Sequence, residues 1–162
     1  MASRIAAEGA SFGPGSLIEV EAGFVPVDWI SEGDLVETRD HGLQPVRSVA
    51  HHTLWMGHVA RHPHHRPVKI DAGALGDGRP WRRLVLSPWH RVRVEGPLAG
   101  DLFGEEWLLT AAARLTRLDG IEQEAATKIT YRRLTFDQPV EIRGEGLWCQ
   151  ADALKEDLRL TG

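Results

Sequence analysis

SFGPGS, residues 11–16, is the stretch of the sequence that indicates the fold most directly. Its glycines and its proline are typical of a turn, and residues of strand character follow it at Leu17–Val20. Further along, LSPWHR at residues 86–91 places a serine and a histidine directly after another short apolar run. Many such short runs, separated by turns about every ten residues, predict an all-β barrel or sandwich-like fold.

The expected secondary structure is almost entirely strand. Strands are expected at Leu17–Val20, Phe24–Val27, Asp34–Thr38, Gln44–Val49, Pro67–Ile70, Arg83–Leu86, Arg91–Val94, Lys128–Tyr131 and Val140–Ile142. Pro45 should lie at a sheet edge or at a strand start, because proline cannot donate a ladder hydrogen bond. One short helix at most is expected, around Trp107–Leu115, where three consecutive alanines have good helix propensity.

Composition narrows the classes of function. A chain of 162 residues suits one domain, and its net charge of −4 argues against a nucleic-acid partner. There is no apolar run long enough to cross a bilayer and no signal-peptide core, so no membrane insertion is expected and the location is cytoplasmic by default. The single cysteine, Cys149, rules out an internal disulfide and a cysteine-based zinc site, and it is expected to be a small buried residue. No cofactor is expected.

In order and spacing, these segments resemble the bacterial branch of the Hint superfamily, the Hedgehog/intein-like domains. The likeness runs from about Ser11 to about Ala153 and includes GDLVETRDHGLQPVR at residues 33–47 and PVKIDAGALG at residues 67–76. It implies a horseshoe-like all-β fold with a pseudo-twofold axis. It also implies a Hint domain at residues 11–153, between a short leader at residues 1–10 and a C-terminal tail at residues 154–162.

The resemblance implies a self-processing reaction at the Ala10–Ser11 bond, with the N-terminal flanking segment as substrate. The first residue of such domains attacks the preceding carbonyl and converts the amide to an ester or thioester, so Ser11 takes the position of the nucleophile. The amide nitrogen needs a proton donor before it can leave, and histidine suits that role near neutral pH. The family places a Thr-x-x-His motif there. Ser87-Pro88-Trp89-His90 resembles it, which makes Ser87 and His90 candidate catalytic residues.

Other positions depart from the family pattern. Relatives read Tyr-x-His-Leu-x-Phe-Asp-x-His near the C-terminal end, whereas this chain has YRRLTFDQP at residues 131–139. Arg133 and Pro139 replace the two histidines, and neither side chain can shuttle a proton. Asp137 is retained and stays a supporting catalytic candidate. A serine hydroxyl is also a weaker nucleophile than the cysteine thiol of most relatives.

Two functions remain open. The first is a single-turnover, self-cleaving domain that rearranges and breaks the Ala10–Ser11 bond. The alternative is a catalytically inactive Hint domain that serves as a binding or structural module. Full splicing is not expected, because its C-terminal step uses a terminal asparagine and the chain contains none. Gln150 is a poor substitute, since its neighbour is Cys149 rather than histidine.

A histidine-rich segment spans residues 51–65. On a helix, His58 and His62 would share a face at the spacing used in zinc sites, which makes them weak metal candidates. Pro63 interrupts such a helix, and a solvated loop between two strands is the expected structure.

Overall fold

The computed structural model describes residues 10–124 and 127–154 and is built mainly of strands. The strands are β1 (Ser11–Phe12), β2 (Leu17–Val20), β3 (Gly23–Pro26), β4 (Leu35–Thr38), β5 (Gly42–Pro45), β6 (Ser48–Trp55), β7 (Val68–Ile70), β8 (Leu84–Leu86), β9 (Arg91–Glu95), β10 (Trp107–Ala111), β11 (Ile121–Gln123), β12 (Lys128–Phe136), β13 (Val140–Gly144) and β14 (Leu147–Ala153). The helices are α2 (Met56–Arg61) and α3 (Gly96–Phe103), with 3₁₀ turns η1 (Val27–Trp29), η2 (Pro63–His65) and η3 (Ala112–Leu115). The predicted all-β class is confirmed.

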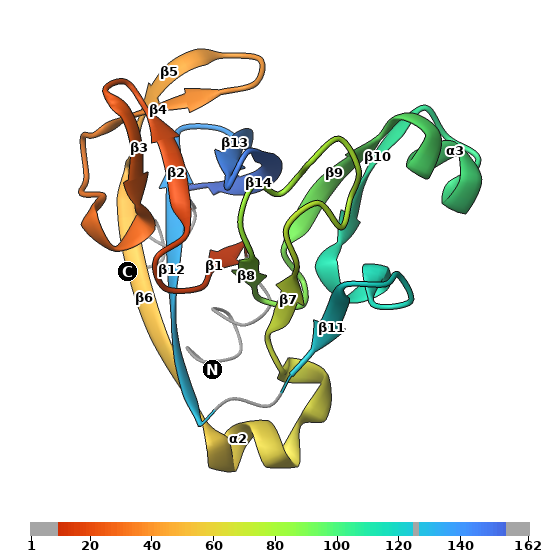
Figure 1. Cartoon of the computed structure of the whole chain (residues 1–162). Coiled ribbons are helices and arrows are strands. Elements are labelled where there is room, and N and C mark those ends of the chain that lie inside the picture. The colour runs from red at the N-terminus through yellow and green to blue at the C-terminus, as the bar shows by residue number, and fades with distance from the viewer. Residues whose placement is uncertain (1–9, 125–126, 155–162) are drawn as a thin grey trace.

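The strands join one sheet that folds back on itself. Its neighbours follow the order β11-β7-β8-β1-β12-β14-β13-β2-β4-β5, with β6 added on β12, β3 on β2, and β9 between β10 and β14. In Figure 1 the long pair β6 and β12 forms one side of the molecule, β7 to β11 form the other, and β1 lies between them. β12 and β14 pair in parallel, which brings the last strand beside the strand that carries β1.

The central position of β1 depends on its burial and on the glycine that follows it. Ser11 and Phe12 are both fully buried, and Ser11 pairs with Arg133 of β12. The Gly13 backbone N–H donates to the carbonyl of Val85 at 2.7 Å. A Cβ at Gly13 would lie 2.8 Å from the Cβ of Val85, so only glycine permits this close approach. The glycine of SFGPGS is therefore what lets β1 lie against β8.

A similar order of elements occurs twice, as expected for a pseudo-twofold. The β2–β3 hairpin leads directly into η1, and the β9–β10 pair leads directly into η3. The boundaries of β2 agree with the prediction at both ends. The stretch expected as one strand at Gln44–Val49 is divided, because β5 ends at Pro45 and β6 begins at Ser48. β5 is an edge strand, as expected from its proline.

The helix expected at Trp107–Leu115 is wrong. These residues form β10 and η3, because Trp107–Ala111 pairs residue by residue with β9 and this pairing overrides the helix propensity of the alanines. The two α-helices lie elsewhere. α3 has Pro97 in its first turn and ends at Phe103, directly before Gly104, whose φ of 70° is left-handed. These are start and stop signals that the sequence does carry.

The histidine-rich segment is also more ordered than expected. His51 and His52 belong to β6, which pairs with β12 over eight consecutive positions, and α2 and η2 follow. The expectation of a solvated loop across residues 51–65 is therefore wrong, because β12 extends far enough to pair with the whole of β6. Among the described residues, no helix is long and apolar enough to cross a membrane.

Candidate functional site

The backbone carbonyl of Ser11 is held by two groups from the turn after β8. The Ser87 backbone N–H donates to it at 3.0 Å, and Nδ1 of His90 lies 3.1 Å from the same oxygen. Ser11, Ser87 and His90 are all fully buried. The structure therefore brings together three of the four catalytic residues expected from the sequence. The two contacts hold the backbone of Ser11, the expected nucleophile, in place.

The imidazole of His90 lies between two carbonyl oxygens. Nδ1 faces Ser11, and Nε2 is 2.7 Å from the carbonyl oxygen of Gln150 in β14. Burial lowers the pKa of His90 below its usual 6.5, while the two carbonyls and the Asp152 carboxylate act in the opposite direction. A neutral imidazole can donate to only one of the two oxygens, whereas an imidazolium donates to both. A neutral His90 therefore leaves one of these two oxygens without a donor from its ring.

Packing fixes the orientation of this ring. Phe12 meets His90 edge to face, with 4.6 Å between ring centroids. The His90 backbone N–H donates to the Ser87 carbonyl at 3.1 Å, which closes the turn, and the Ala113 N–H donates to Pro88. The Ser-x-x-His spacing seen in the sequence is the spacing of this turn. It explains why a serine and a histidine three residues apart reach the same carbonyl.

On the other side of Ser11, the chain is anchored by a charge pair. The Ala10 N–H donates to Oδ2 of Asp152 at 3.3 Å, and Nη2 of Arg133 donates to the same oxygen at 2.9 Å. Ala10 is buried, and the Arg133 side chain is 16% exposed. Nε of Arg133 is buried with no hydrogen-bond partner among the described residues. We call Ala10, Ser11, Ser87, His90, Arg133 and Asp152 the Ser11 site.

The register places the side chains of Arg133 and Ser11 on the same face of the sheet. The two residues are directly opposite each other in the antiparallel β1–β12 pair, and opposite side chains share one face of a sheet. A permanent cation therefore lies on the same face of the sheet as Ser11, at the position where the resemblance places a histidine. Arg133 and Asp152 were not expected as site residues. The one available signal was the charge of Arg133 in a strand motif that also carries large apolar residues, where a carboxylate partner is expected.

The fourth expected residue, Asp137, lies away from these contacts. It follows β12, its side chain is 57% exposed, and its carboxylate pairs with Arg47 at 3.3 Å. Cys149 is fully buried in β14, where burial raises the pKa of its thiol, as expected for a packing residue. Of the weak metal candidates, His62 lies beyond the end of α2, and the side chain of His58 is outside the described part of the chain.

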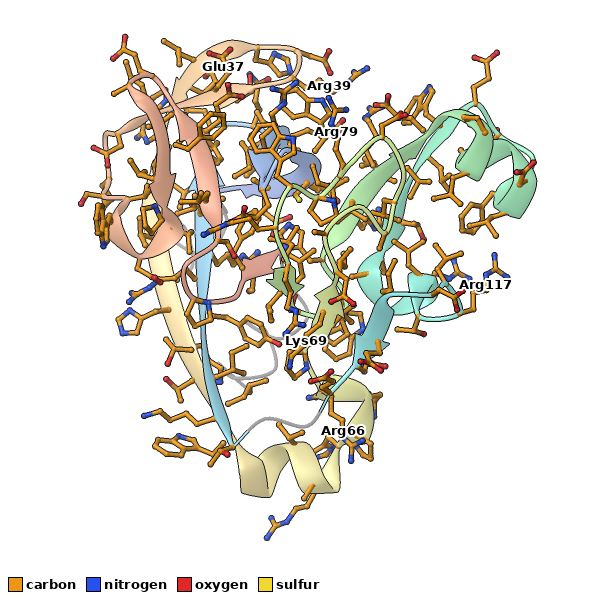
Figure 2. The ribbon with its side chains drawn as sticks, in the orientation of Figure 1. Glu37, Arg39, Arg66, Lys69, Arg79 and Arg117 are labelled. Atoms are coloured by element: carbon orange, nitrogen blue, oxygen red, sulfur yellow. The ribbon has the colours of Figure 1, made fainter. Side chains whose placement is uncertain are left out.

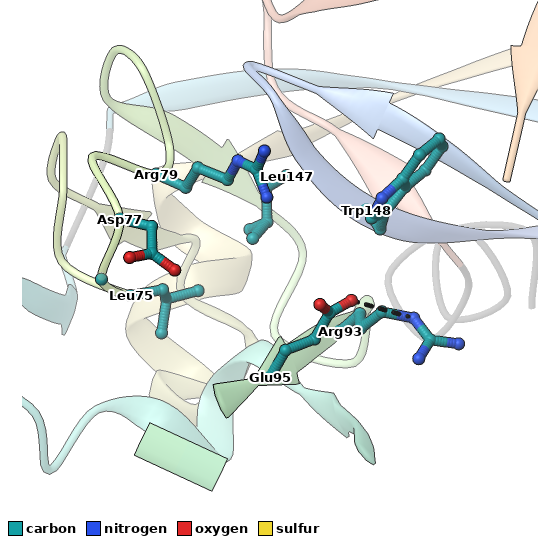
Figure 3. A pocket seen from close by; sticks show the side chains of 8 residues that line it. Leu75, Asp77, Arg79, Arg93, Glu95, Leu147 and Trp148 are labelled. Carbon is teal, nitrogen blue, oxygen red and sulfur yellow. Dashed lines mark ion pairs between the residues drawn. The ribbon is translucent and has the colours of Figure 1, made fainter. Parts of the chain in front are cut away.

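A small cavity of about 40 Å³ lies apart from the Ser11 site. Figure 3 shows Asp77 and Arg79 on one side of it and Trp148 on the other, with the Arg93–Glu95 ion pair at its edge. Arg93 also pairs with Glu141 at 2.7 Å and lies 4.0 Å from the ring of Trp107. These contacts satisfy the buried guanidinium, so we interpret the cavity as a gap beside a structural ion pair.

This sheet topology, with a buried first strand held by a turn histidine, defines the class of intein-like all-β domains. The intein-like domain from Clostridium thermocellum is similar at 13% identity and a TM-score of 0.55, covering 88% of this chain and 98% of its own. The MchDnaB-1 intein is similar at 10% identity and a TM-score of 0.56, covering 87% and 99%. The Ssp DnaB mini-intein variant M86 gives 10% identity, a TM-score of 0.53, and 92% and 98% coverage. At these identities the likeness shows the fold alone.

The sequence matches the Hint domain family over residues 10–153, and the chain belongs to that family. A comparison with curated proteins gave no match.

Proposed function

We propose that this Hint domain carries out an acyl shift and self-cleavage at the Ala10–Ser11 bond, without full splicing. The observation that carries the proposal is the double hold on Ser11. Its carbonyl is bound by Ser87 and His90, and the N–H of Ala10 is bound by Asp152. The peptide between the two residues is therefore fixed from both sides. Fixing the reacting atoms in this way lowers the entropy cost of the attack.

In the proposed reaction, Ser11 Oγ attacks the carbonyl carbon of Ala10, and the bond from that carbon to the Ser11 nitrogen breaks. The hydroxyl proton leaves and a proton reaches the departing nitrogen, so the products are an ester and a free amine. His90 is the proposed proton carrier, because burial lowers its pKa and so favours the neutral imidazole, the form that can accept a proton. Water or an added nucleophile then breaks the ester and releases the leader.

Arg133 is proposed to stabilise the negative charge that develops on the Ala10 carbonyl oxygen. It shares the Ser11 face of the β1–β12 pair, and fixed cations in buried sites stabilise such oxyanions. This role requires charge and not proton transfer, so it suits a residue that cannot lose its proton. Asp152 then acts as a positioning residue, since it holds both Arg133 and the N–H of Ala10.

One observation favours the alternative of an inactive module. Nδ1 of His90 is bound to the carbonyl of Ser11, which lies on the far side of that residue from the Ala10–Ser11 bond. Proton donation to the scissile nitrogen needs a separation of about 3 Å or one intervening water. The ring would have to leave the Ser11 carbonyl before it could reach that nitrogen.

Intact mass spectrometry of the full chain with hydroxylamine tests the proposal. The expected result is slow loss of residues 1–10, with a hydroxamate on the released leader. Ser11→Ala is the matched control and should keep the leader. Ser11→Cys should react faster, because a thiol is the better nucleophile. If the wild type and Ser11→Cys both keep the leader for days, the domain is the inactive module.

A further inference from the structure

We propose that His62, His64 and His65 form a binding site for a divalent transition-metal ion such as Zn²⁺. Each of the three side chains offers a ring nitrogen, and these nitrogens lie within 4.8 Å of one another. Imidazole nitrogen is a ligand that zinc, nickel and copper share. The set differs from the His58–His62 pair at helical spacing, because only His62 belongs to both.

The backbone of this segment is already fixed in a turn. The His65 N–H donates to the His62 carbonyl at 2.8 Å, and the Arg66 N–H donates to Pro63 at 3.1 Å. The side-chain amide of Gln123, in β11, donates to the carbonyls of both His64 and Arg66, at 3.1 and 2.9 Å. In Figure 2, Arg66 marks this segment beside α2, and Lys69 marks β7 leading into the sheet. Little chain entropy is therefore left to lose when an ion binds.

Pro63 helps to build the site. It interrupts the helical spacing of His58 and His62, but its fixed φ suits the first position of η2. The resulting single turn places His62 just before the 3₁₀ helix and His64 and His65 within it. This compact turn brings the side chains of three histidines within a four-residue segment to one place, whereas a longer helix would distribute them around its circumference.

The three rings form one cluster on a packed base. His62 and His65 stack with 5.0 Å between centroids, and His64 meets His65 edge to face at 4.4 Å. His65 is 9% exposed and packs against Trp89 at 4.9 Å, whereas His64 is exposed. Two ligands are thus positioned by neighbouring residues, and the third is free to rotate toward solvent.

The spacing is close to that of a zinc site. With zinc–nitrogen bonds of about 2.0–2.1 Å, the nitrogens of a tetrahedral site lie about 3.4 Å apart. The widest separation in the cluster therefore has to shorten by about 1.4 Å at most. The exposed His64 side chain can rotate to shorten its own separations from the other two nitrogens. Three histidines leave a fourth position for water, as in open zinc sites.

The site is in contact with the residue before His90. Trp89 packs on His65. The next residue, His90, contacts the carbonyl of Ser11. The metal site does not depend on the processing reaction, since none of its ligands belongs to the Ser11 site. Binding is therefore measurable by itself.

The test is calorimetric titration of the untagged full chain with Zn²⁺ alone, together with the visible absorption spectrum of its Co²⁺ form. The expected result is one saturable site at micromolar Zn²⁺ and a tetrahedral Co²⁺ spectrum with nitrogen ligands. His64→Ala should abolish both signals, and His64 is exposed, so its removal leaves the fold intact. His51→Ala is the matched control, because His51 is an exposed histidine of β6, and this variant should bind as the wild type does.

Three outcomes overturn the proposal. The first is no saturable heat in the wild type. The second is unchanged binding in His64→Ala, and the third is equal weakening in His64→Ala and His51→Ala. A His58→Ala variant adds a further distinction: if it abolishes binding while His64→Ala does not, the His58–His62 pair is the site and this cluster is not.

Discussion

Arg133 and Asp152 form an ion pair of 2.9 Å whose shared carboxylate oxygen also accepts the N–H of Ala10. The pair joins the middle of β12 to the end of β14 and holds the residue in front of β1. The charge of this partly buried arginine is therefore compensated by an acid from the last strand of the described chain.

The ion pair between Arg133 and Asp152 should stabilise the folded protein, and the effects of removing its two members should not be additive. Arg133→Met leaves a carboxylate that is 29% exposed without its cation, which should lower the free energy of unfolding by about 1–2 kcal/mol. Asp152→Asn should cost a similar amount. In a double-mutant cycle measured by urea denaturation, the double variant should lose less than the sum. Strict additivity would show that the two side chains act independently.

Arg133→His should slow leader release in hydroxylamine, by about tenfold or more, because an imidazole is not the permanent cation that is proposed to stabilise the oxyanion. Arg132→His is the matched control. Arg132 precedes Arg133 on β12, points to the opposite face and pairs with Asp28 at 3.4 Å. It should leave the rate unchanged. An equal response of both variants in the mass-spectrometric time course would argue against a site at Arg133.

Stability should depend on pH through His90. Its pKa is lowered by burial, so between that value and about 6.5 the unfolded chain holds a proton that the folded chain does not. The free energy of unfolding should therefore fall as pH falls below about 6.5, by up to about 1.4 kcal/mol per pH unit within this window. Denaturation at several pH values should give a flatter profile for His90→Gln. A steeper profile in the variant would contradict the burial effect.

Tyr131→Phe should leave stability unchanged or raise it slightly. The Tyr131 hydroxyl is buried without a hydrogen-bond partner in the described part of the chain, and burial raises its pKa. Folding removes this hydroxyl from water without giving it a hydrogen bond, which costs free energy. The phenylalanine variant avoids that cost, so its free energy of unfolding should rise by no more than about 1 kcal/mol. Thermal unfolding measures it, and a clear loss of stability would point to a bridging water.

Asp137→Asn should affect neither leader release nor stability by much. The carboxylate is exposed and its pair with Arg47 is a surface ion pair, worth less than about 1 kcal/mol. Release should follow the wild-type time course. A strong loss of rate would instead restore Asp137 to the catalytic role that the resemblance implies.

The sequence predicted those features that depend on residues close together in the chain. β2 was predicted at both ends, because a turn bounds the strand on each side, and Ser87 and His90 meet because one tight turn carries both. β10 was predicted as a helix, since the alanines do not reveal the β9 partner that pairs with them. Asp152 was missed for the same reason. Its two partners become visible only once β14 is placed beside β12.

The hydrogen bond from Ala10 to Asp152 spans 142 residues. A ribosome therefore synthesises nearly all of the described chain before this anchor can form, and β1 has no β12 to pair with until late in synthesis. A nascent chain contains Ser11 but no Ser11 site. The proposed chemistry at the Ala10–Ser11 bond would therefore start only after β12 and β14 have been made, and a product that ends before them would keep residues 1–10.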